Sequence, residues 1–86
     1  MYKAVLTRSA EGVLRKVFRS DRQLYWRLIR VLESLKSDPY QGKVLKGRLR
    51  GKYCVRVGTH RIIYEISKGK LVIYVLVIGH RRQVYR

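Results

Sequence analysis

The sequence has little cysteine, few acids and no long apolar run. Its single cysteine, Cys54, excludes an intramolecular disulfide framework, and one cysteine with two histidines at unrelated spacing does not make a zinc site. The longest apolar run, residues 71–78, is less than half of the roughly 20 residues that span a membrane. Because no apolar segment precedes a small-residue cleavage site, we expect a cytoplasmic protein that has no membrane association, metal or small-molecule cofactor.

The shortage of acids leaves a strong positive charge. Five Asp and Glu face 21 Lys and Arg, which gives a formal net charge of +16. Such self-repulsion destabilises a compact state and favours binding to polyanions or to an acidic protein. Nucleic acid is the first expected partner, because each phosphate neutralised by Lys or Arg releases counterions. Five scattered carboxylates also argue against a two-metal nuclease.

The first half of the chain is predicted to form a strand and two helices. Residues 2–7 contain β-branched and aromatic residues typical of a strand. Ser9 is expected to cap a first helix with an apolar stripe. Ser20 and Gln23 fit a capping box for a second helix, which should end before Pro39.

The second half is predicted to form three strands, at residues 53–58, 61–66 and 71–78. The last is apolar throughout, as expected of a central strand covered on both faces. The chain is then a single α+β domain over residues 1–86, with the order β-α-α-β-β-β. We expect an antiparallel sheet with two N-terminal helices packed on one face and the first strand added to it.

Alternation within the two middle strands separates two faces. One face is apolar. The other carries Cys54, Arg56, Arg61, Ile63 and Glu65.

The stretch between the helices and these strands is basic. Residues 40–52 contain three glycines, five Lys or Arg and no acid, which indicates a loop or an irregular sheet edge. This stretch is either a clamp on a phosphate backbone or a solvated loop. The residues expected to contact RNA are Arg48, Arg50, Lys52, Arg82 and Arg86.

Trp26, Arg27 and Arg30 lie off the apolar stripe of the second helix. They form either a solvated helix face or a patch that faces a partner, since exposed Trp and Arg are common at interfaces.

The C-terminal residues could perform chemistry that needs no carboxylate. When a ribose 2′-OH attacks the adjacent phosphate, the protein must hold the nucleotide in line, neutralise the phosphoryl oxygens and move protons. Arginine suits charge neutralisation, histidine suits proton transfer and tyrosine can stack on a base. All three residue types occur within residues 79–86.

Four motifs occur in an order that points to one family. They are Leu45-Lys46-Gly47, Tyr53-x-Val55-Arg56-Val57-Gly58, Arg61-x-x-Tyr64-Glu65, and Gly79-His80-Arg81 with Val84-Tyr85. With these motifs the chain resembles the RelE/ParE superfamily of toxins from toxin–antitoxin modules, most closely its RelE branch. The resemblance covers essentially the whole chain.

The resemblance implies an mRNA endonuclease that cuts without a metal in the ribosomal A site and is neutralised by an acidic antitoxin. Its partners would be that antitoxin, the ribosome and mRNA. The positions that match the catalytic residues of RelE are Lys46, Arg56, Arg61, Arg81 and Tyr85. By resemblance, Arg61 would stabilise the phosphate, Arg81 would stabilise or protonate the leaving oxygen, and Tyr85 would stack on or orient a base.

Two positions depart from RelE. Cys54 stands where RelE has a lysine proposed as a general base, although Lys52 is nearby on the same alternation face. His80 stands where RelE has another lysine. Because the pKa of an arginine exceeds about 12, Arg81 is a poor proton donor and His80 is the favoured acid or base.

Other interpretations stay open at this stage. A toxin of the ParE type would act on DNA gyrase without catalysis, and a plain RNA-binding module would lose affinity evenly as its cations are removed. Cys54 could be an inert residue on a sheet face. The histidine, arginine and tyrosine near the C-terminus could form no more than a solvated basic tail.

Overall fold

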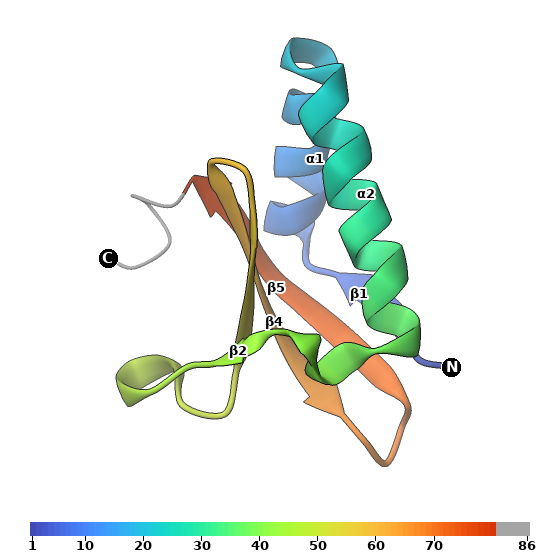
Figure 1. Ribbon diagram of the computed structural model, residues 1–86, viewed down its shortest axis with the longest axis vertical. Coiled ribbons are helices and arrows are strands. Elements are labelled where there is room, and N and C mark those ends of the chain that lie inside the picture. Colours follow the sequence, from blue (N-terminus) through green and yellow to red (C-terminus); the bar gives the residue numbers. More distant parts are fainter. Residues whose placement is uncertain (81–86) are drawn as a thin grey trace.

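The computed structural model describes residues 1–80, which form two helices and a five-stranded sheet (Figure 1). The helices are α1, Arg8–Ser20, and α2, Arg22–Ser37. The strands are β1, Lys3–Leu6; β2, Lys43–Val44; β3, Tyr53–Val57; β4, His60–Ser67; and β5, Val72–His80. Two 3₁₀ turns, η1 at Pro39–Gln41 and η2 at Gly47–Leu49, flank β2. The predicted α+β class and element order are confirmed, with one short strand added.

The sheet is mixed, which corrects the prediction of an antiparallel sheet. Its strand order is β1-β5-β4-β3-β2, and β1 pairs in parallel with β5, from Lys3 opposite Val72 to Leu6 opposite Val75. The other three pairings are antiparallel. The composition of a four-residue strand carries no information on its direction. Parallel neighbours need a long connection, and here two helices and three strands lie between β1 and β5.

Both helices begin at a different cap from the one predicted. Thr7, and not Ser9, caps α1, and its side-chain oxygen accepts a hydrogen bond from the backbone N–H of Ala10 at 3.2 Å. Asp21, and not Ser20, caps α2. Asp21 has the extended backbone that a cap requires, and its carboxylate also interacts favourably with the helix dipole.

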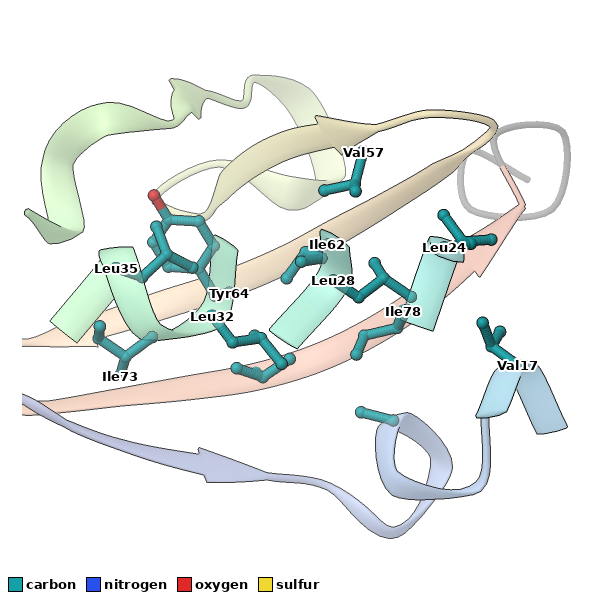
Figure 2. Close-up of a cluster of buried hydrophobic side chains, with 12 residues drawn as sticks. Val17, Leu24, Leu28, Leu32, Leu35, Val57, Ile62, Tyr64, Ile73 and Ile78 are labelled. Carbon is teal, nitrogen blue, oxygen red and sulfur yellow. The ribbon is translucent and has the colours of Figure 1, made fainter. Parts of the chain in front are cut away.

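The two helices cover one face of the sheet, and the main core lies between the helices and that face (Figures 1 and 2). Leucines at helical spacing on α2 pack against alternate residues of β4 and against residues of β5 whose alternation is shifted by a bulge at Leu76. The buried members that Figure 2 labels are Val17, Leu24, Leu28, Leu32, Leu35, Val57, Ile62, Tyr64, Ile73 and Ile78. The apolar face predicted from alternation is therefore the helix-covered face.

The opposite face is covered only in part. A small cluster of Leu45, Cys54 and Ile63, with Leu49 packed against it, joins the basic segment to β3 and β4. Strand β5 was predicted to be covered on both faces, and this is wrong, because Val77 on the uncovered face is 37% exposed. Neither helix within the described residues is long and apolar enough to cross a membrane.

Candidate functional site

A cavity of about 600 Å³ opens on the face of the sheet away from the helices. The segment around β2 forms one wall, and β3 and β4 form the other. The residues that line it are Lys43, Val44, Leu45, Lys46, Cys54, Arg56 and Arg61. Among residues 1–80, the charged groups of this lining are all cations, so we refer to it below as the cationic cavity.

Two arginines lie side by side in one wall of the cationic cavity. Arg56 on β3 and Arg61 on β4 are direct cross-strand partners, one step away from the turn that joins the strands. Gly58 allows this turn to be short, because its φ of 60° lies in the left-handed region that glycine adopts at little cost. Like charges at directly opposed positions destabilise a sheet, so this pairing favours an anion between or above the two side chains.

The other wall is an edge strand of only two residues. Lys43 lies opposite Cys54 and Val44 lies opposite Tyr53, after which the backbone N–H of Leu45 donates a 2.8 Å hydrogen bond to the carbonyl oxygen of Lys52. These bonds hold the β2 segment beside β3, and Lys43 and Lys46 line the same cavity as the two arginines. Lys43 was not predicted as a site residue. Strand alternation would not have found it, because counting back by twos from Cys54 reaches Lys46 and Val44. Lys43 joins the cavity only through the pairing of β2 with β3.

The cationic cavity can bind and polarise a phosphate. Arginine offers a rigid fork of donors for phosphoryl oxygens, and lysine offers a mobile ammonium group. Cys54 forms part of the wall and is 8% exposed, with its side chain in the small apolar cluster. Of the predicted catalytic residues, the structure therefore brings together Lys46, Arg56 and Arg61.

His80 is not part of this cavity. It lies opposite His60 across β4 and β5, and the two ring centroids are 5.9 Å apart in an edge-to-face arrangement. Both histidines line a different cavity of about 430 Å³, next to the junction of the two helices. Arg61 lies opposite Gly79, one residue earlier on β5, so strand alternation places the histidines and the arginines on opposite faces.

The predicted RNA-contacting residues are distributed differently. Arg48 and Arg50 are exposed in and just after η2. Lys52 is half-buried, and its ammonium lies 3.6 Å from the carboxylate of Glu65. Four further predicted site residues lie outside the described residues, namely Arg81, Arg82, Tyr85 and Arg86.

The exposed face of α2 was predicted as either solvated or partner-facing. Trp26 is 55% exposed, and its ring packs edge-to-face on Tyr25, which in turn contacts Phe18. A cluster of this kind is compatible with both interpretations, and each stays a prediction.

A two-helix hairpin on one face of a five-stranded sheet is the fold of a RelE/ParE superfamily toxin, as the sequence motifs predicted. Residues 4–85 match the family described as the ParE toxin of the type II toxin–antitoxin system parDE. The chain belongs to this family of toxins.

Proteins with RelE and YoeB names are also similar. Toxin RelG of Mycobacterium tuberculosis is 36% identical over 45 residues, a match that spans 52% of this chain and about half the length of that relative. The toxin–antitoxin complex RelBE2 from Mycobacterium tuberculosis contains a chain that is 26% identical, with a TM-score of 0.81 over 93% of this chain and 98% of that one.

Two more distant structures share the fold. They are the YoeB/ParE toxin from Agrobacterium tumefaciens, with 23% identity, a TM-score of 0.83 and coverage of 92% and 98%, and the RelBE complex of E. coli, with 20% identity, a TM-score of 0.79 and coverage of 93% and 96%. The relatives thus carry both RelE-type and ParE-type names.

Proposed function

We propose that this toxin is a metal-independent endoribonuclease that cuts mRNA on the ribosome and so inhibits translation. The observation that carries the proposal is the cationic cavity, which is lined by the cross-strand pair Arg56 and Arg61 and by Lys43 and Lys46. The set suits a phosphate that passes through a more highly charged transition state. The five acids are scattered along the sequence, which argues against a two-metal site, since such a site requires clustered carboxylates.

In this mechanism the arginines stabilise charge while protons move through other groups. The ribose 2′-OH loses its proton to water as its oxygen bonds to phosphorus. The bond from phosphorus to the 5′-oxygen breaks, that oxygen takes up a proton from water, and the products are a 2′,3′-cyclic phosphate and a 5′-hydroxyl. Arg56 and Arg61 hold the phosphoryl oxygens but do not give up protons. Lys43 and Lys46 supply ammonium groups at the same cavity, and by resemblance Arg81 and Tyr85 would complete the site.

The partners follow from charge and from the relatives. A net charge of +16 favours ribosomal RNA and mRNA as polyanions, and an acidic antitoxin as the protein that silences the toxin. The RelBE2 and RelBE structures of the relatives are toxin–antitoxin complexes. We place the activity in the cytoplasm, where translating ribosomes are found.

Primer extension on an mRNA in a translating extract tests the proposal. The toxin should produce cuts within the reading frame, and Arg61→Ala should reduce them at least 100-fold, because one lost contact to a developing oxyanion typically has this effect. Arg30→Ala, which removes an exposed arginine from α2, is the matched control and should cut as the unmodified toxin does. The proposal would be contradicted if mRNA stayed intact in the extract while expression of the same toxin stopped the growth of cells.

A second candidate is a toxin that acts on DNA gyrase without cutting RNA. The matched family favours it, because its description is that of a ParE toxin. Cys54 at the wall of the cavity, where RelE by resemblance has a lysine, also favours it. Inhibition of DNA supercoiling by purified gyrase, together with intact mRNA, would establish this function in place of the first.

A further inference from the structure

Tyr64 is a buried tyrosine whose hydroxyl connects two distant parts of the chain. The residue lies on β4 and has no exposed surface. Its hydroxyl donates a 2.7 Å hydrogen bond to the carbonyl oxygen of Pro39 and accepts a 3.1 Å bond from the backbone N–H of Gly42. Figure 2 shows the ring beside Leu35, with the oxygen at the edge of the core cluster. The segment between α2 and β2 is thereby fixed to the middle of the sheet.

The fit around this hydroxyl is close. A Cβ atom on Gly42 would lie 2.5 Å from the Tyr64 hydroxyl and 3.1 Å from the carbonyl oxygen of Cys54, so a larger residue would displace the segment. The Tyr64 ring stacks on Tyr53 with centroids 5.6 Å apart, and Tyr40 packs edge-to-face on Tyr53 at 5.9 Å. Burial also raises the pKa of Tyr64 to about 12, which keeps the hydroxyl protonated and able to donate at neutral pH.

This contact lies directly before one wall of the cationic cavity. Gly42 precedes Lys43, and residues 43–46 form that wall although β2 has only two paired residues. A strand this short and at an edge has little pairing of its own to fix its position. The distance from Lys43 and Lys46 to the opposed arginines therefore depends on where the segment is anchored.

We propose that Tyr64 is a positioning residue of the toxin, whose hydroxyl holds the lysine wall of the cationic cavity at its working distance from Arg56 and Arg61. The inference rests on the proposed function for its effect on RNA, but the positioning itself can be measured without RNA. Tyr64 acts from the core side of the sheet and does not line the cavity.

The single cysteine of the chain reports on this positioning. Cys54 lies opposite Lys43 and is 8% exposed beneath the segment, so its thiol should react faster when the segment loosens. In Tyr64→Phe, the rate of reaction with a disulfide reagent such as dithiobis-nitrobenzoate should rise about 10-fold. Tyr53→Phe is the matched control, because it removes a hydroxyl from the stacked ring and keeps both hydrogen bonds of Tyr64. Its rate should stay within twofold of the unmodified protein.

Cleavage of mRNA gives the second measurement, as a double-mutant cycle. Tyr64→Phe alone should reduce cutting about 10-fold. In a background that carries both Lys43→Ala and Lys46→Ala it should have little further effect, because both lysines of the wall that Tyr64 positions are already gone. A residue that only stabilised the fold would reduce cutting by the same factor in both backgrounds, so equal factors would overturn the proposal.

Gly42→Ala provides an independent route to the same displacement. It should raise the reactivity of Cys54 as Tyr64→Phe does, while the tyrosine ring stays in the core. Unchanged thiol reactivity in both folded variants would overturn the positioning role. Raised reactivity in both, with an unmodified toxin that leaves mRNA intact, would support the positioning role and refute the proposed function.

Discussion

The two faces of the sheet differ in what holds them together. Within residues 1–80, twelve buried residues form the core on the helix-covered face, whereas three form the cluster on the face that carries the cationic cavity. The first face supplies most of the apolar burial, which is the main favourable term in folding. The second face can therefore carry charges that cost stability. The contrast indicates that most of the stability comes from the side of the sheet opposite the cationic cavity.

Adjacent residues of β4 allow a direct test of this contrast. Ile62 and Ile63 are 0% and 2% exposed, yet Ile62 points into the main core and Ile63 into the small cluster. The two residues share a chemistry, a strand and almost the same burial. Differences between their alanine variants should therefore reflect the two faces.

Ile62→Ala should cause the largest loss of stability. We expect a loss of about 4 kcal/mol in the free energy of unfolding, because the dense core between helices and sheet cannot collapse around the cavity that is left. Urea denaturation followed by circular dichroism measures this loss. A loss below about 2 kcal/mol would show that the helix-covered face contributes less than its burial indicates.

Ile63→Ala should cost less, about 2 kcal/mol, because the short segment above it can move inward and fill part of the space. The same movement should narrow the cationic cavity. Folded Ile63→Ala should therefore cut mRNA more weakly than folded Ile62→Ala at matched occupancy of the native state. Equal losses of stability, with equal activity, would remove the distinction between the two faces.

Local patterns in the sequence predicted much of this arrangement. Spacing and alternation identified the helices, the strands and the separate faces of β3 and β4, because these depend on neighbours a few residues apart. The direction of β1 and the separation of His80 from Arg61 were not predicted. Both depend on pairing between segments that are distant in the sequence.

Part of the candidate site could be predicted from strand alternation and from the resemblance. Arg56 and Arg61 could be placed on one face from their positions in the strands, and Lys46 by resemblance. The hydrogen bonds of the Tyr64 hydroxyl could not be found in this way, because its partners Pro39 and Gly42 lie 25 and 22 residues earlier in the chain. No periodic pattern encodes a contact of that kind.

Arg56→Gln should show that repulsion between the cations on the cavity face lowers the stability of the fold. Removing one of two opposed cations should stabilise the fold by about 0.5 kcal/mol at low salt, within the range of cross-strand charge pairs. The gain should disappear near 1 M salt, where the Debye length falls to about 3 Å. Binding to RNA should weaken in the same variant. Arg30→Gln on α2 is the control, and a gain that persists at high salt would contradict the electrostatic explanation.

The smallest predicted effect is on the pH dependence of stability, and it comes from His60 in the cavity next to the helices. Burial of the ring, together with the charge of His80, lowers the pKa of His60 below its ordinary value of 6.5, while the carboxylate of Asp21 opposes this shift. Lys16 lines the same cavity and adds no negative charge. The folded state therefore takes up a proton less readily than the unfolded state. The stability that His60 contributes is complete above pH 6.5 and is lost as the pH falls below that value.

His60→Gln removes this titration. Urea midpoints at pH 7.5 and pH 5.5 should show a smaller loss of stability on acidification in this variant than in the unmodified protein. In His80→Gln the loss should be intermediate, because burial still lowers the pKa of His60 after the neighbouring charge is gone. If His60→Gln instead steepened the loss on acidification, the attraction of Asp21 would outweigh burial, and the histidine cavity would be a stabilising site for positive charge.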